Sequence, residues 1–207
     1  SRGGPVNYGL YRTFGAAYGV EIVGTGGGII VRLHDLTASK VRTQQAYALP
    51  GVADPGFRMQ VHQVADEVTR WASGTEGYAA SRLLYLAGGR IYEVDTDGEE
   101  ARAVTASGVP AFSPAWSPDG RRIAYTRLDR WTVEVLDLAT RGTMTVPGTD
   151  AGQNITPAFS PDGRTVAYAH MDAGGTNLST ADVAQRCCVQ RLTVGRFADN
   201  LSPTFSP

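Results

Sequence analysis

The sequence predicts a small α+β domain followed by the blades of an all-β propeller, and three observations carry this prediction. A Ser-Pro-Asp-Gly unit recurs at a spacing of about 43 residues, a period typical of four-stranded propeller blades. Short apolar strands follow each complete copy of the unit. The first third of the chain lacks the repeat and contains one amphipathic helical pattern instead. We therefore expect two domains, at residues 1–77 and 78–207.

The N-terminal domain is expected to be a helix packed on a sheet. Partial alternation of apolar and polar residues predicts three strands, and a short helix is expected near the N-terminus. Apolar residues at spacings of three and four predict a longer helix that ends before Gly74, the residue type that favours a helix C-cap. The predicted strands are residues 19–23, 29–36 and 42–49, and the predicted helices lie within residues 8–17 and 57–73.

The repeat itself predicts the blades. Residues 113–127 and 156–170 align closely, and a third copy begins at Ser202, where the chain ends before Asp-Gly would follow. The sequence therefore predicts three blades and the start of a fourth, an open or truncated propeller. The aromatic residue of each copy precedes the turn and is placed to pack between neighbouring blades. The repeat residues are Trp116, Pro118, Asp119, Gly120, Phe159, Pro161, Asp162, Gly163 and Phe205.

The chemistry of Ser-Pro-Asp-Gly is that of a tight turn. Pro118 presets φ for the second turn position, Gly120 suits the fourth, and the hydroxyl of Ser117 can hydrogen-bond the turn backbone. The unit should therefore join two antiparallel strands. We interpret Asp119 and Asp162 as turn formers rather than as ligands.

Composition and charge restrict the function. Hydrophobic residues make up 42% and charged residues 19% of the chain, as in globular proteins. The 19 basic and 20 acidic side chains form no long run of one sign, so there is no electrostatic case for binding nucleic acid or anionic lipid. No stretch is apolar enough to predict a membrane span. The chain begins with Ser1, which either removal of an export signal or trimming explains.

Several sequence features are candidates for sites of chemistry. The glycine run at residues 24–28 lacks the lysine and the following helix of a phosphate loop, so we expect a hairpin turn. Cys187 and Cys188 are adjacent and cannot staple distant segments; we expect two thiols in a loop, although such a pair can oxidise or bind a soft metal. No metal, cofactor or catalytic site is predicted. The histidines, which lack metal-ligand spacing, are His34, His62 and His170.

The repeats resemble the propeller of the TolB family of the Tol-Pal cell-envelope system. Residues 61–68 look like the helix segment that ends the family's N-terminal domain, residues 32–35 resemble the strand before it, and residues 14–24 resemble an earlier strand entry. The resemblance runs in order from about residue 7 to residue 207. It implies a periplasmic protein that performs no chemistry and binds partners: the lipoprotein Pal through the propeller, and Tol components through the N-terminal region.

The predicted function is therefore that of a protein–protein interaction scaffold. A propeller presents loops on a rigid frame, so we expect the partner at loops around residues 110–112 and 150–155. The candidate partner-binding residues are Pro110, Phe112, Asp150 and Asn154. Two alternatives stay open. One is an accessory structural subunit on the periplasmic face of a transport, electron-transfer or photosynthetic membrane complex. The other is the propeller portion of a serine peptidase, which needs a further hydrolase domain.

Overall fold

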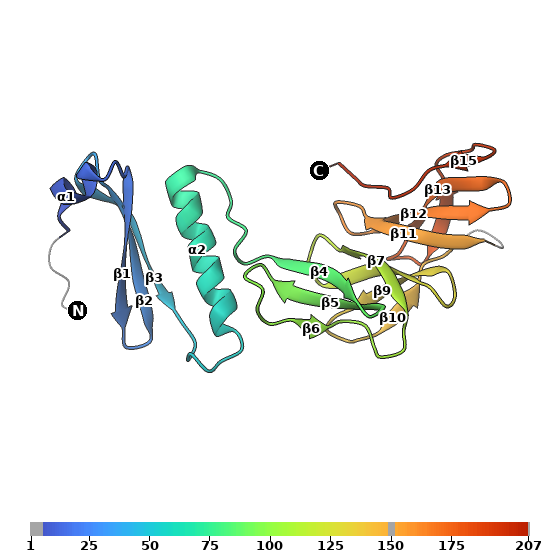
Figure 1. Cartoon of the computed structure of the whole chain (residues 1–207), viewed down its shortest axis with the longest axis horizontal. Coiled ribbons are helices and arrows are strands. Elements are labelled where there is room, and N and C mark those ends of the chain that lie inside the picture. The colour runs from blue at the N-terminus through green and yellow to red at the C-terminus, as the bar shows by residue number, and fades with distance from the viewer. Residues whose placement is uncertain (1–5, 149–151, 207) are drawn as a thin grey trace. The chain divides into compact units, whose positions relative to one another are not determined.

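The computed structural model describes residues 6–148 and 152–206, and the chain divides into two units, Ser1–Ser81 and Arg82–Pro207 (Figure 1). The first unit contains the short helix α1 (Tyr8–Thr13) and a three-stranded antiparallel sheet in the order β1-β2-β3. Its strands are β1 (Tyr18–Thr25), β2 (Gly28–Asp35) and β3 (Lys40–Ala48). The glycine run forms the turn between β1 and β2, which confirms the hairpin.

Helix α2 (Phe57–Ser73) packs on one face of this sheet. Val31 and Leu33 of β2 are fully buried, and Val64 is the buried residue of the helix. The hydroxyl of Tyr47 on β3 donates a 2.8 Å hydrogen bond to Glu67 of the helix. The helix ends at Gly74, whose φ of 77° is left-handed, so the predicted C-cap is confirmed. None of the helices in the described part of the chain is long and apolar enough to cross a membrane.

The second unit consists of three antiparallel sheets, which we call blades 1, 2 and 3 and which confirm the predicted propeller fold (Figure 1). In the described residues, blade 1 has three strands and lacks a counterpart of β7. Blade 1 comprises β4 (Arg82–Ala87), β5 (Arg90–Asp95) and β6 (Arg102–Ala103). Blade 2 comprises β7 (Ala111–Trp116), β8 (Arg122–Arg127), β9 (Thr132–Asp137) and β10 (Thr143–Thr145). Blade 3 comprises β11 (Gln153–Phe159), β12 (Thr165–Asp172), β13 (Gly175–Asp182) and β14 (Cys187–Arg191), with β15 (Ala198–Asp199) beside β13.

The Ser-Pro-Asp-Gly units form the expected turns between the first two strands of blades 2 and 3. The amide of Gly120 donates to the carbonyl of Ser117 at 2.9 Å, and Gly120 has a φ of 65°. The Ser117 hydroxyl donates to Asp119 and accepts from the amide of Arg122. The hydrogen bond from the Ser117 hydroxyl, followed by one from the amide of Arg121, holds the pKa of Asp119 below its usual value. The same contacts recur in blade 3, so both aspartates are turn formers.

The core of this unit lies between the blades, as predicted for the two aromatic residues. Trp116 packs against the cluster shared by blades 1 and 2, which includes Ile91 and Ile123. Phe159 belongs to the cluster shared by blades 2 and 3. Arg122 of blade 2 also reaches blade 3: its guanidinium lies 5.3 Å from the Phe159 ring centre and donates a 2.8 Å hydrogen bond to the carbonyl of Gly163.

The prediction of two free thiols in a loop is wrong. Cys187 and Cys188 are joined by a disulfide, and they open strand β14. Cys187 pairs with Asp182 across the sheet, so the strand begins directly after the turn instead of several residues later. In blade 2 the corresponding position holds Gly142, which precedes the first residue of β10.

Candidate functional site

The structure gathers three of the four predicted partner-binding residues at one end of blades 2 and 3. Pro110 precedes β7, and its carbonyl accepts a 2.9 Å hydrogen bond from the amide of Leu128, in the hairpin between β8 and β9. The far side of that hairpin reaches blade 3, because the carbonyl of Trp131 accepts a 2.8 Å bond from the amide of Asn154. We call residues 110, 112, 128–131 and 154 the hairpin surface. Asp150, the fourth candidate, lies outside the described residues.

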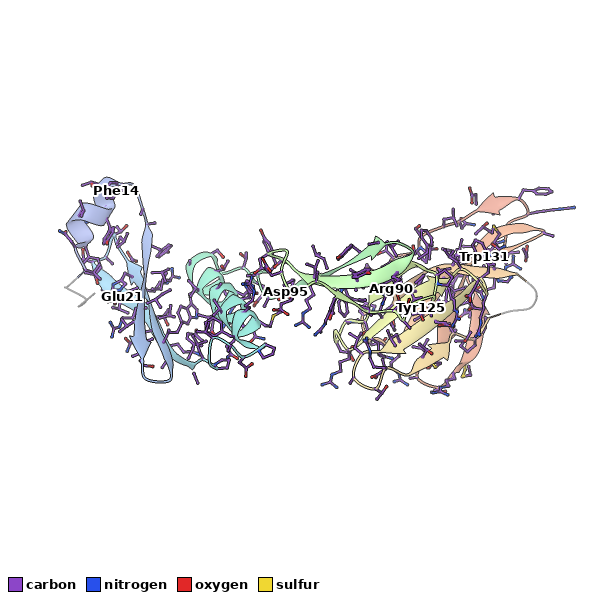
Figure 2. The ribbon with its side chains drawn as sticks, turned by 60° about the horizontal axis from the view of Figure 1, so that its bottom comes forward. Phe14, Glu21, Arg90, Asp95, Tyr125 and Trp131 are labelled. Atoms are coloured by element: carbon purple, nitrogen blue, oxygen red, sulfur yellow. A yellow bond between two sulfur atoms is a disulfide. The ribbon has the colours of Figure 1, made fainter. Side chains whose placement is uncertain are left out.

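Two large aromatic side chains of the hairpin surface are open to solvent. Phe112, the second residue of β7, is 42% exposed, and Trp131 is 41% exposed. Trp131 is labelled in the second unit in Figure 2. Sequence reasoning missed Trp131. The available signal was a bulky aromatic residue in a charged hairpin turn, Asp129-Arg130-Trp131, where polar residues are usual.

The structure corrects the role of Asn154. It lies in strand β11 rather than in the predicted loop, and its side chain is only 9% exposed. Its amide oxygen lies 2.8 Å from Nδ1 of the buried His170. The reason is that pairing with β12 starts at Gln153, which draws the predicted loop residues into the sheet. Asn154 therefore supports the hairpin surface from within, while Phe112 and Trp131 form its exposed part.

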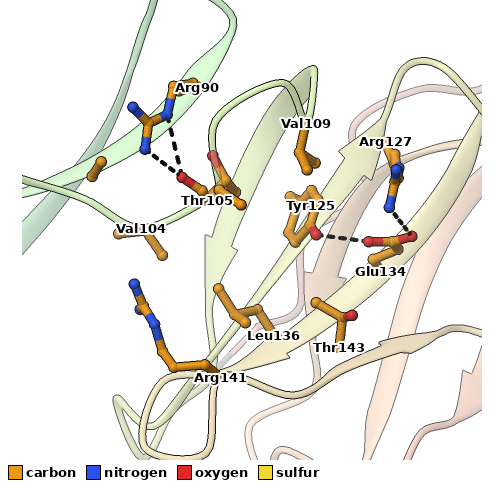
Figure 3. Close-up of a pocket in the computed structure, with 12 residues that line it drawn as sticks. Arg90, Val104, Thr105, Val109, Tyr125, Arg127, Glu134, Leu136, Arg141 and Thr143 are labelled. Atoms are coloured by element: carbon orange, nitrogen blue, oxygen red, sulfur yellow. Dashed lines mark hydrogen bonds and ion pairs between the residues drawn. The ribbon is translucent and has the colours of Figure 1, made fainter.

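A charged network fixes the hairpin that carries this surface. Tyr125 donates a 2.7 Å hydrogen bond to Glu134, which is 3% exposed, and Arg127 binds the other oxygen of that carboxylate at 3.3 Å (Figure 3). Arg127 also forms two hydrogen bonds with Asp129 in the hairpin, at 2.7 and 3.2 Å. Burial, followed by the contact with Glu134, raises the pKa of Tyr125 above its ordinary value. The hydrogen bond from Arg127 lowers the pKa of Asp129.

A cavity of about 340 Å³ lies beside this network, between blades 1 and 2 (Figure 3). Three arginines line it, with Glu134 as its carboxylate. Arg90 is held by the carbonyl of Thr105 at 2.8 Å, whereas Arg141 is exposed and has no hydrogen-bonding partner among the described side chains. Because Glu134 is already bound by Tyr125 and Arg127, the cavity offers a cationic lining rather than a free base. It suits an acidic or polar group of a ligand.

Two of the three histidines are buried core residues. His34 lies on β2 with Nδ1 2.8 Å from the Tyr8 hydroxyl and Nε2 3.3 Å from Glu21. His170 is bound to Asn154. Each ring thus has a polar neighbour that satisfies it. His62 lies in α2.

Residues 72–207 match the model of the TolB β-propeller domain. The chain belongs to the TolB β-propeller family. The Tol-Pal system protein TolB of Bordetella avium is 34% identical over 151 residues, which is 69% of this chain and 34% of that protein. TolB of Chromobacterium violaceum is 35% identical over 147 residues, 65% of this chain and 33% of that protein. The chain thus spans about a third of the length of these curated relatives.

This chain also resembles a solved structure of TolB. The crystal structure of TolB from Acinetobacter baumannii superimposes with a TM-score of 0.73 at 25% sequence identity. The match covers 93% of this chain and 52% of that one. The family resemblance drawn from the repeats is therefore confirmed, both for the propeller and for the fold.

Proposed function

We propose that this TolB-family chain is a non-catalytic module for protein–protein recognition, located in the periplasm and linking components of the cell envelope. The observation that carries the proposal is the hairpin surface, which presents Phe112 and Trp131 about two-fifths exposed on a rigid frame of blades. Family membership supports the same reading, because the relatives are Tol-Pal system proteins.

The physical properties of the hairpin surface favour binding. Trp and other large aromatic residues supply much of the energy of protein interfaces, because they bury a large area with few rotatable bonds. Arg130 lies between Asp129 and Trp131 and adds a charged rim to the aromatic centre. The ion pair of Arg127 with Asp129 holds the hairpin in place before any partner arrives, which reduces the ordering cost of binding.

The partner we propose is a component of the Tol-Pal system, a Pal-like lipoprotein or a Tol protein. The decisive experiment measures the affinity of the purified chain for these components by calorimetry. Trp131→Ala and Phe112→Ala should each weaken binding at least tenfold, as expected for central aromatic anchors. Tyr78→Ala is the matched control, because Tyr78 is a 79% exposed aromatic residue of the other unit. Wild-type affinity in both hairpin variants would show that the hairpin surface is not the site.

A second candidate function is that of a structural subunit in a larger membrane complex that faces the periplasm. The observation that favours it is an apolar face on blade 1, where Leu83 is 57% and Tyr85 39% exposed. The Tyr85 ring stacks on Tyr92 of the next strand at 5.4 Å, so the face is ordered and sheet-like. Affinity capture from gently solubilised envelopes separates the two candidates. A stoichiometric complex without Tol-Pal components supports the second, and Tol-Pal components support the first.

A further inference from the structure

The adjacent cysteines lie at an irregularity in the pairing of the last two strands of blade 3, β13 and β14, which blade 2 lacks. In blade 2, β9 and β10 pair in step: Leu136 faces Thr143 and Val135 faces Met144. In blade 3 the register between β13 and β14 shifts after Asp182 faces Cys187. The next pair is Thr180 with Gln190. Two residues, Cys188 and Val189, therefore stand opposite one residue of β13, which is the definition of a β-bulge.

The backbone at the bulge is unusual for cysteine. Cys188 has a φ of 63°, in the left-handed region where glycine is favoured at such bulges. The neighbouring left-handed residue, Arg186, has a counterpart in Arg141 of blade 2 and belongs to the shared turn. Cys188 has no such counterpart on β10. A residue held in a sparsely populated conformation that its repeat does not require points to a function of that residue.

The disulfide cannot serve as an ordinary structural staple. Disulfides stabilise proteins mainly by closing loops in the unfolded chain, and the effect grows with loop length. Cys187 and Cys188 are neighbours in the sequence, so the disulfide between them closes no loop of intervening residues. Removing it should therefore leave the stability of the blade nearly unchanged, and another reason is needed for two cysteines at this place.

The surroundings of the pair allow reaction. Cys188 is exposed and Cys187 half-buried, on β14, the outermost strand of its sheet among the described residues. The Gln185 side chain lies 3.8 Å from the sulfur of Cys187. Arg186 directly precedes the pair, and its side chain has no ion pair with any side chain that the structure describes. Basic neighbours stabilise a thiolate, the form that reacts and that binds metals.

We infer that Cys187 and Cys188 form a reversible redox site, an exposed disulfide that an external dithiol reduces and whose reduced form binds a soft, thiophilic cation through both sulfurs. A thiolate of the dithiol attacks Sγ of Cys188; the bond between the cysteines breaks, and Cys187 leaves as a thiolate that takes a proton. The second thiol of the reagent then loses its proton and attacks the reagent's first sulfur, which is bonded to Cys188 in the mixed disulfide. This step releases Cys188, which takes up that proton. Two electrons pass to the cysteine pair, and the reagent becomes a disulfide.

Reduction places two soft sulfur ligands on neighbouring residues. Thiolates prefer soft ions, and two of them on one strand end can hold the same ion. The site lies at the turn end of blade 3, next to the Asp182–Cys187 pair, whereas the hairpin surface lies at the β8–β9 hairpin. It therefore does not depend on the proposed partner binding and extends beyond it.

The first arm of the test uses the native full chain and dithiothreitol as the dithiol. Intact mass spectrometry after alkylation should show that both cysteines are blocked before treatment and both alkylated after it, without denaturant. The rate should be within about tenfold of that of the unfolded chain, as expected for an exposed bond. Two free thiols before treatment, or reduction only after unfolding, would overturn the inference.

The second arm measures Cd²⁺ binding to the reduced chain by calorimetry. The reduced chain should bind one ion per molecule, while the oxidised chain and the single variants Cys187→Ser and Cys188→Ser should bind at least about tenfold more weakly, because one sulfur is lost. Circular dichroism and thermal unfolding of the serine variants check that the blade stays folded. If a folded single variant binds Cd²⁺ as tightly as the reduced wild type, the pair is not a chelating site.

Discussion

Replacing Tyr125 with phenylalanine should destabilise this protein more than the same replacement of Tyr168, its counterpart one blade later. Both rings are buried in the cores between blades, with exposed fractions of 2% and 0%. The two hydroxyls differ in their acceptors. Tyr125 donates at 2.7 Å to the buried carboxylate of Glu134, whereas Tyr168 donates at 3.0 Å to the neutral carbonyl of Pro147.

The magnitude follows from the acceptor. A hydrogen bond to a charged group contributes about 1.5–3 kcal/mol to stability, and a neutral one about 0.5–1.5 kcal/mol. Loss of the Tyr125 hydroxyl also leaves one oxygen of Glu134 without its donor, while Arg127 still holds the other. We therefore expect Tyr125→Phe to cost about 1 kcal/mol more than Tyr168→Phe. The ring packing should be unchanged in both variants, because phenylalanine keeps the aromatic ring.

Urea unfolding followed by linear extrapolation measures this difference, provided that both variants keep the wild-type slope. A double-mutant cycle assigns it: in the Glu134→Gln background, Tyr125→Phe should cost less than in the wild type, because the acceptor is no longer charged. Equal losses for the two tyrosine variants, or a larger loss for Tyr168→Phe, would refute the reasoning. An unchanged cost in the Glu134→Gln background would place the effect elsewhere than in this hydrogen bond.

Three further predictions concern pH and the turns. Burial raises the pKa of Tyr168 to about 12, so the contribution of its neutral hydroxyl to the free energy of unfolding should be intact below pH 10 and lost as pH rises through 12. Tyr168→Phe should remove this loss in unfolding measurements. The pKa of Asp162 is lowered, chiefly by the Ser160 hydroxyl, so the contribution of its carboxylate to the free energy of unfolding should be present above about pH 4 and lost as pH falls further. An NMR titration of Asp162 can follow this change. Gly163→Ala should cost more in urea unfolding than Gly120→Ala. Both glycines have left-handed φ, but an added Cβ at Gly163 meets the Arg122 guanidinium at 3.1 Å and at Gly120 meets nothing.

The blades could be predicted because their cause is local. The turn between the first two strands of a blade is specified by four consecutive residues, and it sets the register of the pair whatever surrounds it. The helix at Phe57–Ser73 was predictable for the same reason, since its apolar spacing and Gly74 are both read from one segment. Packing of Trp116 and Phe159 between blades then follows from their place just before the turn.

The candidate site was harder to predict because its cause is not local. Asn154 is buried because β11 pairs with β12 and because its amide donates a hydrogen bond to the carbonyl of Trp131 in another blade, and neither partner is visible in the segment itself. Trp131 belongs to a hairpin whose position depends on an ion pair and on Pro110. The strand position of the cysteines was missed because the repeat alignment places Cys187 at the turn position of Gly142, whereas pairing in blade 3 already begins with Cys187 opposite Asp182.

Comparison of the blades separates scaffold from function. The turn aspartates recur with the same contacts in blades 2 and 3, and the buried tyrosines recur as core residues of these two blades, so neither needs a partner to explain it. Glu134 does not recur, because its place across from the tyrosine is taken by Tyr92 in blade 1 and Ser179 in blade 3. The bulged Cys188 also has no counterpart on β10. A repeat protein needs only the recurring chemistry in order to stack, so residues that break the repeat while staying ordered are where selection for a specific activity should be sought.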